Sequence, residues 1–184
     1  MAQEVGGSTP LTHPIHLDLI KAFGFRRMPE GPRAFFVGSA GVVSVRIFGP
    51  SRGQQPRAVI IGLDGAPYSL IRRLVDAGEM PNLGRLLDQG SILPMQSVLP
   101  TVSSVAWASI VTGCLPGKHD IFGFIDRHPR THEMFIPSSR NLKVKTWIDI
   151  LSGMGKRVFS MGVPMTYPPR AVNGVLISGF MAPS

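Results

Sequence analysis

Apolar residues follow two patterns along the chain, short continuous runs and longer segments with helical spacing. Continuous runs occur at residues 58–63 (AVIIGL), 157–163 (RVFSMGV) and 175–180 (VLISGF). Runs of this length are typical of strands that are buried on both faces of a sheet. We therefore expect residues 58–63 to form a central strand with parallel neighbours.

Helical spacing occurs between these runs. It predicts two amphipathic helices, within residues 68–78 and 80–90, each closed by a glycine. Their apolar positions are Leu70, Ile71, Leu74, Val75, Leu83, Leu86 and Leu87. Residues 91–99 have strand character, and Thr146 can cap a further helix at residues 147–154. This order of strands and helices predicts an α/β fold, a parallel sheet with helices on both faces.

Residues 1–56 have a different character from the rest of the chain. Residues 35–48 favour two short strands around residues 38–41, and residues 49–56 (GPSRGQQP) are typical of a linker. We therefore expect two parts: a poorly defined N-terminal extension and linker at residues 1–56, and an α/β domain at residues 57–184.

Composition and charge narrow the classes of function. Hydrophobic residues make up 43% of the chain and charged residues 16%, as expected for a folded domain. The formal charge of +8 is spread evenly, with seven Lys/Arg against three Asp/Glu in residues 1–57 and twelve against eight in residues 58–184. Because nucleic-acid binding needs a concentrated basic surface, we expect no nucleic-acid partner.

The sequence contains no membrane or export pattern that we can identify. Residues 34–45 are apolar but too short to span a bilayer, and Arg33 and Arg46 flank them. The start of the chain (MAQEVGG) lacks the basic residues and apolar stretch of a signal peptide. The single cysteine, Cys114, excludes an internal disulfide. We expect no transmembrane segment.

The segment from Pro100 to His119 contains the strongest candidate chemistry. It begins with small hydroxyl residues, continues as an apolar helix and reaches Gly113, where the helix should end. The start of a helix presents unpaired N–H groups and the positive end of the macrodipole, so it can hold a phosphate beside a nucleophilic serine. The alternative is structural, since Ser and Thr are also favoured there as N-caps.

Asp64 is the second candidate, because it follows the apolar run at residues 58–63. A carboxylate at the C-terminal end of such a strand lies where α/β sheets bind ligands, although a turn or cap aspartate is an equally good interpretation. Asp64 and Ser103 could meet at one edge of the sheet. Their oxygens are ligands that a divalent metal can bridge.

These residues belong to an ordered series of motifs. The series is VIIGLDG at 59–65, MPNL at 80–83, SSVAWASIVTG at 103–113, PGKH at 116–119, VPMTYPP at 163–169, NG at 173–174 and SGF at 178–180. In this order and spacing the motifs resemble the N-terminal part of the type I phosphodiesterase/nucleotide pyrophosphatase family, within the alkaline phosphatase superfamily. The resemblance covers residues 57–184 and does not extend to residues 1–56.

The resemblance implies an alkaline-phosphatase-like core and a hydrolase with two divalent metal ions, expected to be zinc. Such enzymes cleave small-molecule phosphate esters through a covalent phospho-enzyme. Asp64 matches the first metal-ligand aspartate, and Ser103 matches the nucleophile, which also contacts a metal. Many members have Thr at this position and related ones Ser, so the chemistry is retained. Thr101 and Ser104 are the fallback positions for the nucleophile.

Two departures from the family pattern bear on activity. Asp120 stands where a glycine usually follows His119. The family completes its metal sites with an Asp-x-x-x-His, an Asp-His pair and a further His, all downstream of Ser184. Neither His119 nor the pair His128 and His132 matches them. Because Asp64 and Ser103 are too few ligands for a zinc site, we expect a truncated chain, with an incomplete fold, that is inactive alone.

Three other functions can be weighed against this hypothesis. A phosphomutase of the same superfamily stays open. A sulfatase would show Cys or Ser in a C/S-x-P-x-R context, which residues 103–107 (SSVAW) do not provide. The alternative outside enzymes is a non-catalytic product of a truncated gene, acting as a binding module. Turnover by the zinc-loaded chain, lost in Ser103→Ala, would separate the enzyme from the binding module.

Overall fold

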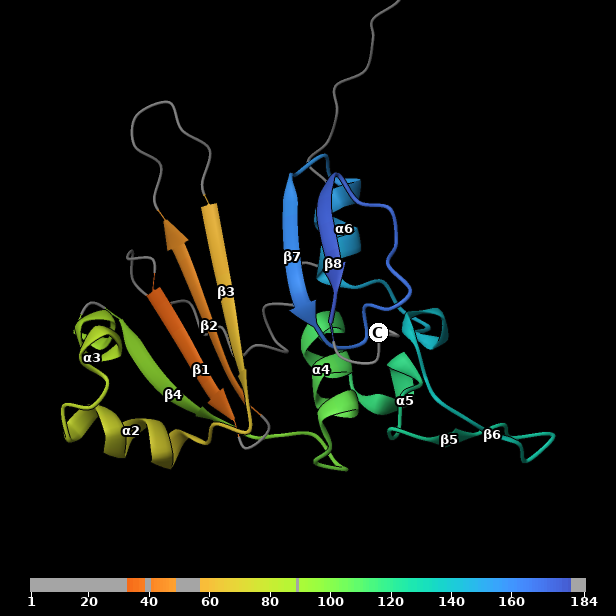
Figure 1. Cartoon of the computed structure of the whole chain (residues 1–184), viewed down its shortest axis with the longest axis horizontal. Helices are drawn as coiled ribbons and strands as arrows, with labels where there is room; N and C mark the ends of the chain where they lie inside the picture. The colour runs from red at the N-terminus through yellow and green to blue at the C-terminus, as the bar shows by residue number, and fades with distance from the viewer. Residues whose placement is uncertain (1–32, 39–40, 49–56, 89, 180–184) are drawn as a thin grey trace, which may run out of the picture.

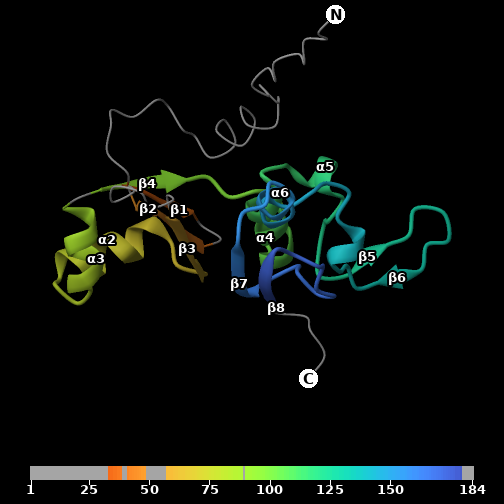
Figure 2. The same ribbon diagram turned by 90° about the horizontal axis from the view of Figure 1, so that it is seen from above.

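A computed structural model describes residues 33–38, 41–48, 57–88 and 90–179 (Figure 1). The expected linker at residues 49–56 lies outside these ranges. Figure 2 shows two groups of elements: a four-stranded sheet with two helices on one side, and a second group built around α4 (Ser103–Thr112) on the other. No helix in the described ranges is both long and apolar enough to cross a membrane.

The four-stranded sheet contains β1 (Arg33–Gly38), β2 (Gly41–Phe48), β3 (Arg57–Asp64) and β4 (Ser91–Met95), in the order β3-β2-β1-β4. β2 pairs antiparallel with both β1 and β3, and β4 pairs parallel with β1. The two strands expected within residues 35–48 are therefore confirmed, although β1 begins two residues earlier, at Arg33. They join β3 in one sheet, so the strands on either side of the expected linker at residues 49–56, β2 and β3, pair directly with each other.

The prediction of a central, parallel, fully buried strand at residues 58–63 is wrong. β3 lies at the edge of its sheet and is antiparallel to its neighbour β2. Its side chains are exposed, with Val59 at 46% and Ile61 at 57%. An apolar run specifies an extended strand, whereas its neighbours depend on which other strands reach it. Here β2 precedes β3 along the chain and takes the adjacent position.

The two helices between β3 and β4 form where helical spacing predicts them. α2 (Tyr68–Asp76) and α3 (Pro81–Leu87) pack together around the buried Ile71. The surrounding partly buried side chains are Ala66, Tyr68, Val75, Met80, Leu83 and Ile92. Gly78 follows α2 with a φ of +75°, a left-handed conformation that favours glycine and ends the helix.

α4 is the centre of the second group. Seven of its ten residues are buried, so the helix is enclosed on nearly all sides. Around it lie α5 (Pro116–His119), a 3-10 helix η1 (Ser139–Asn141) and α6 (Trp147–Gly153). Ala108 of α4 forms a core cluster with Ile121, Leu142 and Met165.

Two small sheets complete the second group. β5 (Asp126–Arg127) and β6 (Met134–Phe135) form a short antiparallel hairpin that projects from the body (Figure 1). β7 (Val158–Val163) and β8 (Gly174–Ser178) pair parallel, as expected for the apolar runs in this region. Helices and strands thus mix as in an α/β protein. The described strands nevertheless form three separate sheets, and a single parallel core is not found among them.

Candidate active site

The N-terminal end of α4 carries no side-chain cap. Ser103 is the first helical residue, and the N-cap position before it is Val102, whose carbonyl accepts the Ala106 N–H at 3.0 Å. The interpretation of these hydroxyl residues as an N-cap is therefore wrong. The N–H groups of the first turn point out of the helix without a carbonyl partner within it, which is the usual basis of an anion site.

The three hydroxyl candidates occupy different environments. Ser103 is half-buried in the first turn, and Thr101 is exposed in the connection that precedes the helix. Ser104 is 1% exposed, and its Oγ has no hydrogen-bond partner among the described residues. Of the three, Ser103 combines the helix start with partial exposure.

A close contact joins α4 to β3. The six-membered ring of Trp107 lies directly against Gly62. A Cβ added at Gly62 would overlap Cη2 of Trp107 and would lie 2.9 Å from Cζ3 and 3.3 Å from Cζ2. Trp107 is 8% exposed, so its ring has little room to move away. Glycine is thus required at this point of the strand by the neighbouring ring.

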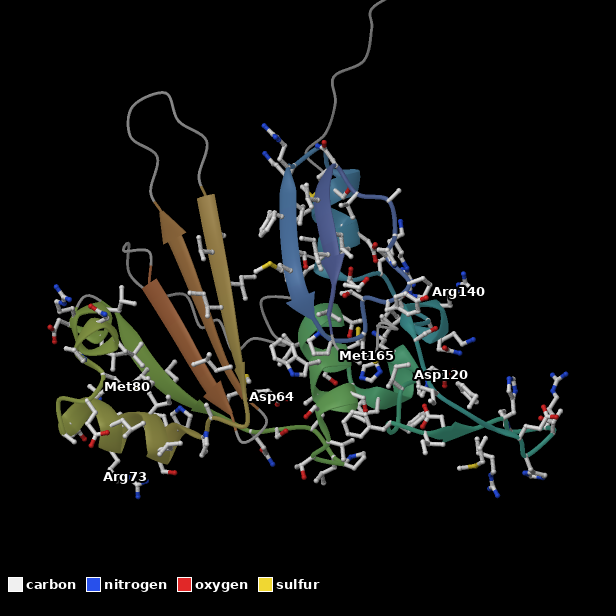
Figure 3. All side chains as sticks on the ribbon, viewed as in Figure 1. Asp64, Arg73, Met80, Asp120, Arg140 and Met165 are labelled. Carbon is white, nitrogen blue, oxygen red and sulfur yellow. The ribbon has the colours of Figure 1, made fainter. Side chains whose placement is uncertain are left out.

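The structure places Asp64 and Ser103 toward the same end of the sheet. Asp64 is the last residue of β3 and is exposed (Figure 3). β4 runs in the same direction as β3, because it is parallel to β1 and both β1 and β3 are antiparallel to β2. The connection at residues 96–102 therefore leaves the sheet at the end where β3 stops, and it leads directly into Ser103.

The two residues do not complete a metal site. A four-coordinate zinc takes at least three protein ligands in its catalytic form, whereas Asp64 and Ser103 supply two oxygen donors. Within the described ranges no group of three or more His, Cys, Asp or Glu side chains is placed to hold a metal. His128 and His132 flank the exposed turn between β5 and β6, consistent with the loop that Pro129 predicts in place of a helix.

His119 has a structural environment. The ring is fully buried, its Nδ1 accepts the Ile121 N–H at 3.2 Å, and its Nε2 lies 2.9 Å from Ser109 Oγ. Because Nδ1 is an acceptor, Nε2 carries the proton and donates it to Ser109. Burial lowers the pKa of His119, partly offset by the carboxylate of Asp120, so the neutral ring links α5 to α4.

The motif at residues 163–169 is anchored by a network that motif matching did not identify. Arg170 Nη1 donates to Asp149 Oδ2 at 3.1 Å and Nη2 donates to the Ser139 carbonyl. Ser139 Oγ in turn donates to the Pro168 carbonyl at 2.6 Å. Asp149 also forms the capping box of α6 with Thr146. Arg170 therefore joins α6, η1 and the loop after β7.

Comparison with known proteins supports the motif series. A family model, type I phosphodiesterase / nucleotide pyrophosphatase, matches residues 58–180, which is more than half of the chain. No solved structure matches the chain. The matched range contains Asp64, Ser103 and the anchored loop at residues 163–169. The chain therefore belongs to the type I phosphodiesterase/nucleotide pyrophosphatase family, a family of phosphate-ester hydrolases.

Proposed function

We propose that Ser103 is the nucleophile of a metal-dependent phosphoesterase acting on phosphodiesters or nucleotide pyrophosphates. The observation that carries the proposal is the position of Ser103, at the uncapped start of a buried helix inside the family-matched range. Asp64, at the same end of the sheet, supplies the carboxylate. The family match supports a small-molecule phosphate ester as the substrate.

The proposed reaction proceeds in two displacements. Ser103 Oγ loses its proton to solvent and attacks phosphorus; as the Oγ–phosphorus bond forms, the bond to the leaving oxygen breaks, and that oxygen departs with the electron pair and takes up a proton from solvent. The N–H groups of the first turn of α4 hold the non-bridging oxygens, where negative charge accumulates. Water then attacks the phosphoserine, releases the phosphate group and restores the Ser103 hydroxyl.

We propose that the cofactors are two divalent ions, zinc in the first instance, of which Asp64 and Ser103 would contact one. Bound divalent ions lower the pKa of a coordinated hydroxyl and neutralise phosphate charge. The pair of oxygen donors suits such an ion in chemical type but not in number. Further ligands must therefore come from outside this pair.

The test is hydrolysis of bis-p-nitrophenyl phosphate by the zinc-loaded chain. Ser103→Ala should lower kcat at least about a thousandfold, because removal of a nucleophile leaves only binding and electrostatic contributions. Thr101→Ala and Ser104→Ala are matched controls that delete one hydroxyl each and should retain turnover. Mass spectrometry of acid-quenched enzyme should find the phosphoryl group on the peptide that contains Ser103.

Three results would contradict the proposal. Turnover that survives Ser103→Ala but is lost in Thr101→Ala or Ser104→Ala would move the nucleophile to the neighbouring position. A zinc-loaded chain that neither turns over nor becomes phosphorylated would contradict the proposal for the chain by itself; it would favour either a non-catalytic binding module or the inactive chain that the incomplete set of metal ligands predicts. Transfer of the phosphoryl group to an added alcohol in preference to water would indicate a phosphomutase.

A further inference from the structure

The contact between Gly62 and Trp107 fixes the relative position of β3 and α4. The Cβ direction of Gly62 points into the Trp107 ring, so this face of β3 is the one turned toward α4. Side chains alternate along a strand, and β3 pairs with β2 in unbroken register from Arg57 to Asp64. Asp64, two residues beyond Gly62, therefore projects on the same side of the strand.

Ser103 occupies the matching place on the helix. Residues four apart lie on one face of an α-helix, so Ser103 shares the face of Trp107 that meets β3. The step from Gly62 to Asp64 covers about 6.6 Å of strand, and the step from Trp107 back to Ser103 covers about 6 Å of helix. The two steps are nearly equal and lead to the same end of the sheet.

We propose that Gly62 and Trp107 are positioning residues, which set the spacing and register of β3 and α4 so that Ser103 faces Asp64. The inference rests on the proposed function for its catalytic meaning, since it concerns the same pair of residues. Its geometric content is independent of activity. The Trp107 ring sets the distance between α4 and β3, and Gly62 is the residue of β3 against which the ring packs.

The contact predicts a specific pattern of loss and rescue. In Gly62→Ala the new methyl group meets the six-membered ring of Trp107 and displaces α4 from β3. This methyl group meets Cη2, Cζ3 and Cζ2 of Trp107. A Phe side chain is shorter and has no atoms at these positions. Gly62→Ala combined with Trp107→Phe should therefore restore the register of the helix on the strand.

The geometric test uses chemical bridging and needs no turnover. Asp64→Cys and Ser103→Cys are introduced together with Cys114→Ala, which removes the natural thiol. Dibromobimane, a short reagent that becomes fluorescent on joining two thiols, then reports how often positions 64 and 103 face each other. Adding Gly62→Ala should reduce the yield of bridged chain at least about threefold, and adding Trp107→Phe as well should return it to the parent value.

Gly153→Ala is the matched control, because a Cβ at Gly153 has no neighbour within 4 Å. It should leave bridging unchanged. Unchanged bridging in Gly62→Ala, or bridging that Trp107→Phe fails to restore, would overturn the proposal. If Gly62→Ala does not fold, circular dichroism must show that the double variant does fold. A double variant that stays unfolded counts against the proposal.

A second arm of the test applies to turnover. Gly62→Ala should lower kcat for bis-p-nitrophenyl phosphate at least about tenfold with KM within about twofold, because alignment of the nucleophile changes while the substrate contacts remain. Trp107→Phe should restore kcat in the double variant. A loss of kcat that is accompanied by a loss of thermal stability, neither of which Trp107→Phe restores, would indicate a merely structural contact. If bridging follows the expected pattern in a chain that shows no turnover, the geometric proposal holds, and only turnover by this chain alone is contradicted.

Discussion

The hydroxyl of Ser103 and the imidazole of His119 show how backbone position decides the role of a polar side chain. Ser103 is at the start of α4, where its side chain makes no capping bond. His119 has both ring nitrogens engaged inside the protein. The first is available for chemistry, whereas the second is committed to structure. Residue type alone would rank them in the opposite order, because histidine is the commoner catalytic group.

Protonation of His119 should destabilise the fold in mild acid. The pKa of His119 is lowered from its ordinary value of 6.5, chiefly by burial. Below about pH 6.5 the unfolded chain binds a proton that the folded chain does not, so the free energy of unfolding falls as pH decreases. Urea unfolding between pH 7.5 and 5.0 should show this fall in the wild type.

The matched comparison is between a buried and an exposed histidine. His119→Gln should lower stability at neutral pH and flatten the acid dependence, whereas His128→Gln, at an exposed position, should leave that dependence intact. An acid dependence that survives unchanged in His119→Gln would assign the effect to other groups.

Helix starts provide a stability test of the two interpretations of α4. Thr146 accepts the Asp149 N–H at 3.1 Å and begins α6 with a capping box. Thr146→Ala should therefore lower the free energy of unfolding by about 1 kcal/mol. Ser103→Ala removes no such bond and should change stability by less than about 0.5 kcal/mol. Urea unfolding of both variants at pH 7.5 measures the difference.

The comparison has a clear contrary outcome. A loss in Ser103→Ala as large as that in Thr146→Ala would mean that Ser103 stabilises the helix start after all. The nucleophile hypothesis requires the opposite pattern, a variant that is stable and inactive.

Most elements could be predicted from local sequence, because their signals are local. The helical spacing before Gly78 and the Thr146 cap predict α2 and α6, and Gly113 ends α4 in a left-handed conformation with a φ of +66°. The partners of β3 could not be predicted, because its apolar run is equally consistent with a central or an edge position. Asp64 and Ser103 were identified from motifs, whereas the Gly62–Trp107 contact depends on residues far apart in sequence.

At the scale of the whole molecule, β3 presents an apolar edge. Ile61 is 57% exposed, and residues 58–63 contain neither a charge nor a proline. Exposed strand edges usually carry a charged residue or a proline, because these residues prevent pairing between chains. We therefore expect concentration-dependent self-association of the chain, measured by light scattering.

A charge on the strand should suppress this association. Ile61→Lys should lower the scattering at a given concentration with little loss of stability, because the side chain is already exposed. Leu99→Lys is the matched control, since Leu99 is 80% exposed but lies outside the strands. Equal effects of the two substitutions would attribute the association to net charge and not to β3.

The shared volume of Gly62 and Trp107 also constrains how homologous sequences can diverge. A larger residue at position 62 is tolerated only where position 107 has already become smaller, since the reverse order passes through an overlap. Substitutions at the two positions should therefore be ordered along a lineage, with position 107 changing first. Homologues should have glycine at position 62 where position 107 is a large ring, or a larger residue at position 62 where position 107 is smaller. A larger residue at position 62 together with a large ring at position 107 should be rare.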